Sequence, residues 1–159
     1  MKTIYLLAAS IMLSTQVGAQ QLVSQEEYVK YQKLSATSAL DPITEDPKAP
    51  KIIIFQPEVT KTVKAPFSIE VFFRPYENQK ISWKSFKALY GSMQFDITDR
   101  LLKMATISDN SLYISNADIP VGTHKITLLI ADEMQRKAQK EFIVAVEKWN
   151  DIFVHLPWL

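Results

Sequence analysis

The sequence contains no cysteine, only two histidines and only three glycines in 159 residues. Without cysteine no disulfide can stabilise the fold, so its stability must come from a hydrophobic core, for which roughly a hundred ordered residues suffice. Two histidines without cysteine argue against a structural zinc site, and so few glycines argue against a backbone loop that cradles phosphate. We therefore expect neither a metal nor another cofactor.

Catalytic motifs and clusters of one charge are also missing. The 18 lysines and arginines balance 17 aspartates and glutamates and form no basic block, which argues against nucleic acid or an anionic membrane as the main partner. The sequence has no G-x-S-x-G, P-loop or H-E-x-x-H motif, and its acids form no recognisable catalytic pair. These absences predict that the protein is not an enzyme. A small hydrolase, which would need a concave pocket with converging acids, is the least favoured alternative.

Residues 1–19 have the composition of a secretory signal peptide. Lys2 supplies a short positive region, residues 4–13 form a compact apolar run, and Val17 and Ala19 are small residues that signal peptidase accepts. The run is shorter than the about 20 residues of a membrane-spanning helix, which argues against a retained anchor. No later stretch is long and apolar enough to cross a bilayer. We therefore predict cleavage after Ala19 and an exported protein, periplasmic or extracellular.

Residues 20–50 are predicted to form an N-terminal arm and a proline-rich linker, flexible or partly helical. Ser24 and Glu27 have the S-x-x-E spacing of a helix capping box, which indicates a short helix. One side of that helix would carry Tyr28, Tyr31 and Leu34. The following stretch, DPITEDPKAP, has three prolines and three acids in ten residues, which is typical of an extended linker. We place the domain boundary near Pro50.

Residues 51–147 consist of short segments in which every second side chain is apolar. This period of two is typical of antiparallel strands that bury one face, and about seven of them, spaced by roughly 8–12 residues, predict an all-β, two-sheet sandwich. The predicted strands are KIIIFQ, FSIEVFF, SFKALY, MQFDIT, SLYIS, HKITLLIA and EFIVAV. The side chains that the pattern directs into the core include Phe67, Ile69, Val71, Phe73, Phe86, Ala88, Tyr90, Met93, Phe95, Ile97, Leu112, Ile114, His124, Ile126, Leu128, Ile130, Phe142, Val144 and Val146. A helix over residues 83–89 is the alternative for the third segment.

The order of these segments resembles the immunoglobulin-like domains of bacterial exported proteins. The resemblance covers residues 51–147 and depends on PFSIEVFF at 66–73, ISWKSFKALYG at 81–91, FDIT at 95–98, IPVGTHKITLLIAD at 119–132 and FIVAV at 142–146. It implies an immunoglobulin-like antiparallel sandwich. Such domains serve as spacers, adhesin segments and binding platforms, so the resemblance implies no single function. The family's last hairpin usually carries Asp-x-x-Gly-Asn, whereas residues 132–136 contain no glycine, so we expect a different or longer turn.

His124 lies on the inward face of its predicted strand, two residues after Gly122. Near this corner of a sandwich, an aromatic ring with a polar tip often bonds to the chain upstream, so we interpret His124 as structural; a metal-binding or acid–base role is the alternative. Five aspartates could supply oxygen ligands for calcium, but no complete ligand loop is present, and we interpret them as turn and strand-end residues. They are Asp96, Asp99, Asp109, Asp118 and Asp132.

Residues 148–159 form an aromatic C-terminal tail with two of the three tryptophans. Its candidate partner-binding residues are Trp149, Ile152, Phe153, Leu156 and Trp158, of which the first four have the i, i+3, i+4, i+7 spacing of one helical face. Burying such side chains is worth roughly 1.5–3 kcal/mol each, so we expect the tail to be covered. The tail could pack on its own sandwich, or it could dock on a protein partner or a second copy. It could also lie in a membrane interface, but the small number of basic residues argues against this third alternative. The stretch IFVHLPWL could instead add to a sheet edge as a strand.

Taken together, these patterns predict an exported, non-enzymatic binding or assembly module of the bacterial cell envelope. It would dock a protein partner, or associate with itself, through the tail or a sheet surface, and peripheral membrane contact stays open. The alternative from another functional class is a carbohydrate-binding module, in which planar aromatic side chains stack on sugar rings. Its candidates, expected to be exposed on the outward faces of their strands, are Phe72, Trp83 and Tyr113.

Overall fold

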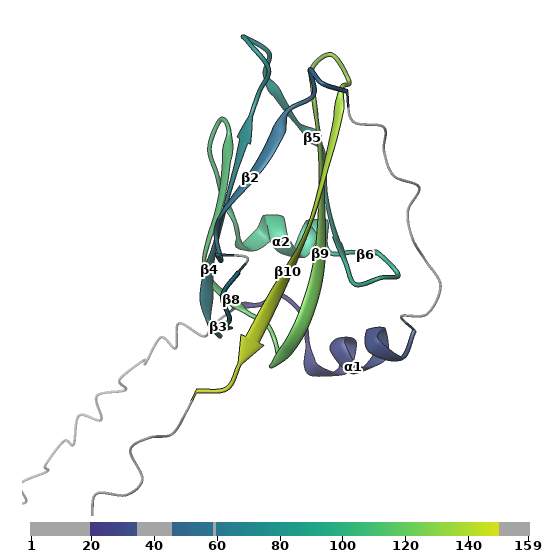
Figure 1. Ribbon diagram of the computed structural model, residues 1–159, viewed down its shortest axis with the longest axis vertical. Coiled ribbons are helices and arrows are strands. Elements are labelled where there is room, and N and C mark those ends of the chain that lie inside the picture. The colour runs from purple at the N-terminus through teal and green to yellow at the C-terminus, as the bar shows by residue number, and fades with distance from the viewer. Residues whose placement is uncertain (1–19, 35–45, 59, 150–159) are drawn as a thin grey trace, which may run out of the picture.

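The computed structural model describes residues 20–34, 46–58 and 60–149. Within these segments the chain forms two β-sheets that pack face to face, with one helix at an end of the sandwich and a second along its side (Figure 1). The predicted all-β sandwich is therefore confirmed. No helix within the described segments is long and apolar enough to span a membrane.

The first sheet has the strand order β1-β8-β4-β2, and β7 extends it by pairing with β8. Its strands are β1 (Gln20–Gln21), β2 (Lys51–Gln56), β4 (Phe67–Arg74), β7 (Thr106–Ile107) and β8 (Ser111–Asp118). The second sheet has the order β3-β10-β9-β5-β6. Its strands are β3 (Val63–Lys64), β5 (Ile81–Tyr90), β6 (Phe95–Asp96), β9 (Gly122–Asp132) and β10 (Lys137–Glu147).

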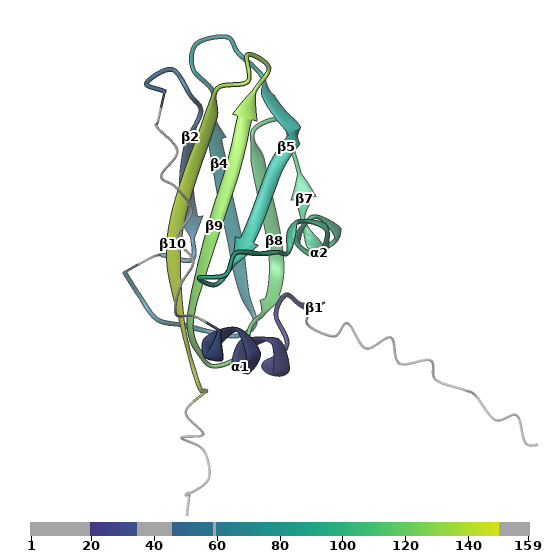
Figure 2. The ribbon, with the colours of Figure 1, turned by 90° about the vertical axis from the view of Figure 1, so that its right-hand side faces the viewer.

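Two consecutive strands, β2 and β3, belong to different sheets of the sandwich. β2 pairs with β4 in the first sheet, and β3, which follows it in the chain, pairs with the end of β10 in the second. The pairings of β1 with β8 and of β3 with β10 are parallel, whereas the other pairings of the described strands are antiparallel. Because β2 and β10 belong to different sheets, they lie beside each other without pairing (Figure 2).

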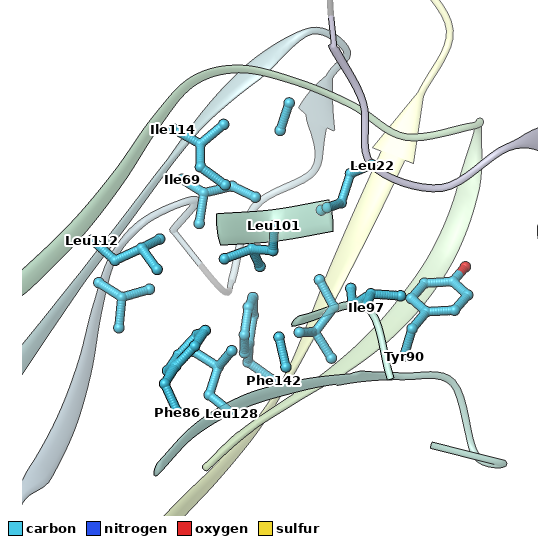
Figure 3. Packing of buried hydrophobic residues seen from close by; sticks show 14 of the residues in the cluster. Leu22, Ile69, Phe86, Tyr90, Ile97, Leu101, Leu112, Ile114, Leu128 and Phe142 are labelled. Atoms are coloured by element: carbon cyan, nitrogen blue, oxygen red, sulfur yellow. The ribbon is translucent and has the colours of Figure 1, made fainter. Parts of the chain in front are cut away.

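Every second side chain of the long strands points between the sheets, as the period of two predicts. The predicted inward residues that are buried are Ile69, Val71, Phe73, Phe86, Ala88, Tyr90, Ile97, Leu112, Ile114, His124, Ile126, Leu128, Ile130, Phe142, Val144 and Val146. Figure 3 shows Phe86 and Phe142 of the second sheet on one side of this core and Leu112 of the first sheet on the other. Residues 83–89 lie within β5, so the helical alternative for them is wrong.

The fourth predicted strand is reduced to two residues. MQFDIT contributes only the two residues of β6, and the chain then enters α2 (Thr98–Met104). The helix sequence TDRLLKM contains good helix formers, and Asp96 turns the chain into it because its Oδ1 accepts the N–H of Thr98 at 2.9 Å. Leu101 of α2 is buried between the two sheets (Figure 3). Met93, predicted to be inward, is instead 40% exposed.

The N-terminal arm contains α1 (Gln25–Lys33), and its predicted capping box is confirmed. Ser24 Oγ accepts the N–H of Glu27 at 3.1 Å, and Glu27 Oε2 accepts the N–H of Ser24 at 2.8 Å. Leu22 and Val23, which the sequence pattern did not single out, are buried in the core ahead of the helix. The arm therefore contributes to the core of the sandwich.

The hairpin between β9 and β10 closes without glycine because Asp132 organises it. Gln135 adopts the left-handed conformation that glycine usually supplies (φ 61°), and its N–H donates to the Asp132 carbonyl at 3.0 Å. The buried Asp132 carboxylate accepts the N–H groups of Met134 and Arg136 at 2.9 and 3.0 Å. Gln135 thus takes the left-handed position without glycine, and the side-chain bonds of Asp132 stabilise the turn.

Candidate binding surface

The sandwich has two sides at which an edge of one sheet lies next to an edge of the other. A helix lies along one of these sides, whereas the other is open. α2 lies along one side, next to β5, and buries Leu101 there. On the opposite side β2 and β10 lie next to each other (Figure 2). Their side chains border an open groove. We call this groove the β2–β10 seam. Its lining residues are Ile52, Ile53, Ile54, Lys140, Glu141, Phe142 and Ile143.

Both strands of the seam carry an uncharged apolar run at a sheet edge. The runs are IIIF at 52–55 in β2 and FIVAV at 142–146 in β10. Natural edge strands are usually protected from pairing by charge, proline or a bulge. These two runs have no charge or proline, so only a bulge could protect them.

The two edges differ in regularity. β2 has a shift in register between Ile54 and Gln56, which distorts its edge. β10 pairs with β9 without a shift from Lys137 to Val146. β3 covers the outer edge of β10 only at Val146 and Glu147. Among the described strands, none therefore pairs with residues 137–145 on that side.

Large apolar side chains are exposed around the seam. Ile143 is 52% exposed in β10, and Phe55, which follows the seam residues of β2, is 58% exposed. Trp149, just after β10, is 65% exposed. Apolar side chains scattered singly need no explanation, but one that lines an apolar groove, as Ile143 does, is typical of an interaction site. The seam and its surroundings are therefore the best candidate for a binding surface in the described segments.

One of the two charged residues that line the seam is unpaired, and it is a lysine. Glu141 is paired with Lys125, with 2.6 Å between Oε2 and Nζ. Lys140 forms no ion pair with any residue of the described chain. It is aligned with the buried Leu128 of β9, so it stands on the inward face of β10 next to Phe142 and lines the groove. An adjoining pocket, which Lys140 also lines, contains one further base and one acid, Lys51 and Asp46.

Trp149 is the single described member of the five residues predicted to bind a partner. Its Nε1 donates to the Ala65 carbonyl at 2.8 Å, and Lys64 Nζ lies 5.2 Å from the centre of its ring. The start of the tail is thus fixed next to β3, but the indole remains largely exposed. The other four predicted residues lie outside the described segments: Ile152, Phe153, Leu156 and Trp158.

The three aromatic residues proposed for sugar stacking do not share a face. Phe72 and Tyr113 lie on the outward face of the first sheet, half-buried and 41% exposed respectively. Trp83 is in the second sheet and packs edge-on against Phe73 of the core, with 5.2 Å between the ring centres. Its Nε1 donates to the Asp109 carbonyl at 3.2 Å. The expectation that Trp83 is exposed beside the other two is wrong, because it closes one end of the core.

His124 is buried (1% exposed) and bonds at both ring nitrogens. Nε2 is 2.7 Å from the Pro120 carbonyl, which can only accept, so Nε2 carries the proton and Nδ1 accepts from the Tyr90 hydroxyl at 2.6 Å. Burial lowers the pKa of His124, although the bond to Pro120 opposes this. Burial also raises the pKa of Tyr90. The predicted bond from His124 to the chain upstream is confirmed, and this neutral pair is structural.

A second set of contacts, not anticipated from the sequence, fastens α1 to the sandwich. Arg100 of α2 donates from Nη1 and Nη2 to the two carboxylate oxygens of Glu27, both at 2.8 Å, and from Nη1 to the Leu22 carbonyl at 2.9 Å. Arg100 thereby holds the pKa of Glu27 at about 2. The rings of Tyr28 and His124 lie 4.6 Å apart between centres. The capping box was the only sequence signal for this site, and it revealed the helix but not the partner of Glu27.

The five aspartates considered as calcium ligands are dispersed. Asp96 binds Thr98 and Lys87, and these bonds lower its pKa to about 2. For Asp132, burial acts to raise the pKa, but bonds from Arg136 outweigh it and lower the pKa. The remaining three are Asp99 in the first turn of α2, Asp109 in the β7–β8 loop and Asp118 at the end of β8. No group of three or more metal-binding side chains gathers in the segments that the structure describes.

Comparison with known proteins gives little further guidance. No protein-family model matches the chain. No curated protein sequence matches it either. Among solved structures, it is similar to CopC from Methylosinus trichosporium OB3b at 9% sequence identity and a TM-score of 0.43, with 65% of this chain and 100% of that chain covered. A likeness at this level carries no argument about function, which must come from the surface itself.

Proposed function

We propose that this protein is an exported immunoglobulin-like domain that binds another protein in the bacterial cell envelope without catalysis. Binding would take place at the β2–β10 seam and the adjoining aromatic tail. The observation that carries the proposal is the open groove between the edges of the two sheets, which is lined by apolar side chains of β2 and β10, among them Ile143, which is more than half exposed. The composition of residues 1–19 supports export, and the strand order supports membership of the immunoglobulin-like class.

The physical argument is one of uncovered apolar area. A Trp or Phe that is removed from water at the centre of an interface contributes strongly to binding, and such residues dominate measured interface energetics. Trp149 is suited to this role because its bond to Ala65 already restrains the ring, which reduces the entropy lost on docking. The residues that follow Trp149 would enlarge this apolar surface.

Capture of partners from the envelope of the producing bacterium tests the proposal. The protein from Gln20 onward, crosslinked to its neighbours, should retain a partner that is lost when Ile143→Lys places a charge at the seam. Deleting residues 150–159 should weaken the same capture. Ile107→Lys is the matched control, because Ile107 is 43% exposed but lies on β7, away from the seam. The same proteins retained by all four forms would show that neither the seam nor the tail binds them.

Carbohydrate binding is the second candidate, favoured by the exposure of Tyr113 beside Phe72 on the first sheet. The Tyr113 hydroxyl lies 3.5 Å from Ser68 Oγ, so an aromatic face and hydroxyl groups occur together there. If the protein binds glycans, Tyr113→Ala should abolish retention on a glycan array, whereas Ile143→Lys should not. If the unmodified protein binds no glycan on the array, carbohydrate binding is excluded as its function.

A further inference from the structure

We propose that the outer edge of β10, residues 137–145, accepts an extended segment of the partner as an additional strand, and that this segment carries apolar and acidic side chains on its inward face. The inference rests on the proposed function and deepens it. It specifies which part of the seam binds and which chemistry the partner presents there.

The edge of β10 is suited to strand addition by its backbone. Its pairing with β9 is unbroken from Lys137 to Val146, so its outward N–H and C=O groups form a regular row. The fold already uses the end of this row, because β3 pairs there in parallel with Val146 and Glu147. The shifted register of β2 makes the opposite border of the seam a poorer template.

The inward face of the added strand would meet mostly apolar surroundings. Side chains alternate along a strand, so every second residue of the partner segment would point into the seam. There it would contact Ile52 and Ile54 of β2 and Phe142 of β10. Backbone bonds would give general affinity, and these alternate positions would give specificity.

Lys140 is the residue that would select the partner's charge. It stands on the inward face of β10 and lines the groove, and no described carboxylate pairs with it. An inward charge at a sheet edge opposes the addition of a wholly apolar strand. A glutamate or aspartate opposite Lys140 removes that penalty. A second copy paired on the same edge with its Lys140 opposite this one would place like charges together, whereas an acidic segment would not, so the charge favours an acidic partner.

Two synthetic nine-residue peptides test the inference on the protein from Gln20 onward. One has the sequence Thr-Ile-Thr-Val-Thr-Glu-Thr-Val-Thr, and the other has lysine in place of glutamate. The glutamate peptide should slow hydrogen exchange of amides in residues 137–145 and bind at least threefold more tightly than the lysine peptide. Lys140→Glu should reverse this preference. Lys137→Glu, which changes an exposed residue on the outward face of the same strand, should preserve it.

Three results would overturn the inference. If neither peptide slows exchange in β10, its edge is not the acceptor, and if Lys140→Glu leaves the preference unchanged, Lys140 does not select charge. If the peptides bind only after residues 150–159 are removed, the tail of this chain occupies the edge instead of a partner. The proposed function is tested separately by the partner capture. If Ile143→Lys loses the envelope partner but the peptides do not slow exchange in β10, the seam binds a protein by a mode other than strand addition.

Discussion

His124 shows how a single polar ring can belong to a hydrophobic core. Its two nitrogens are fully used by Pro120 and Tyr90, so the ring is buried without an unpaired polar group. Because burial lowers its pKa, the neutral form is the one that folds. This residue therefore links the stability of the core to pH.

We expect the free energy of unfolding to decrease as the pH falls below about 6.5, the usual value for histidine, because the unfolded state then binds a proton that folded His124 resists. Glu27 and Asp96 also have lowered pKa values, but their contribution is lost only at more acidic pH, between about 4.5 and 2. Chemical denaturation between pH 7.5 and 5.5 measures the effect. In His124→Phe, the free energy of unfolding should no longer decrease between pH 7.5 and 5.5. At pH 7.5 it should already be about 1–3 kcal/mol lower than in the unmodified protein, because Tyr90 and Pro120 lose their hydrogen-bond partner.

Gly122 is the position where a side chain is least tolerated. It has φ 141°, and a Cβ there would collide with the hydroxyl of Tyr28. We expect Gly122→Ala to destabilise the protein by about 2 kcal/mol more than Gly91→Ala, since Gly91 also has a positive φ but its Cβ would meet nothing closer than 3.9 Å. Thermal unfolding of the two variants measures the difference. Equal losses would mean that the approach of Tyr28 is not constrained.

At the scale of elements, the docking of α1 depends on contacts from distant parts of the chain. Glu27 bonds to Arg100 of α2, Tyr28 packs on His124 of β9, and Tyr31 stacks on Phe95 of β6 with 3.7 Å between the ring centres. α1 itself has no buried residue. Its position is therefore held by these contacts and by the buried residues that precede it, rather than by an apolar helix face.

We expect Arg100→Ala to accelerate hydrogen exchange throughout α1 while leaving β9 and β10 unchanged. The loss in global stability should be small, about 0.5–1 kcal/mol, because the ion pair is partly exposed. Lys103→Ala, a change at an exposed lysine of the same helix, controls for any effect on α2 itself. Exchange that is unchanged in α1 would show that the tyrosines alone fix the helix.

At the scale of the whole molecule, the sandwich includes residues on the N-terminal side of the proline-rich stretch. Leu22 and Val23 are buried in the same cluster as residues of both sheets, and β1 pairs with β8. The core therefore draws on residues that are about thirty positions ahead of its first long strand. A domain boundary near Pro50 would separate Leu22 and Val23 from the rest of the core.

A chain that begins at residue 46 should consequently be much less stable than one that begins at Gln20. The two buried side chains alone contribute about 3–6 kcal/mol, which is comparable with the roughly 5–15 kcal/mol that stabilises an ordinary domain. Urea denaturation of both forms measures the difference. A shortened chain of undiminished stability would show that the arm is dispensable.

The sequence predicted the long strands because alternation is a local pattern, and it predicted the helix cap of α1 because Ser24 and Glu27 are three residues apart. It predicted a strand over MQFDIT because that segment alternates, but only Phe95 and Asp96 pair with β5. It did not predict α2, in which Leu101 is buried between the sheets. Leu22 and Val23 lie in no periodic segment. The seam joins residues about ninety positions apart, so its existence follows from the order of the strands rather than from any motif.

The described chain starts and ends at the same pole of the sandwich. Gln20 is aligned with Ala117 near the end of β8, and Val146 is aligned with Gly122 only a few residues further along (Figure 2). The segments before Gln20 and after Trp149 therefore attach to the sandwich at one pole, and the β9–β10 hairpin lies at the other.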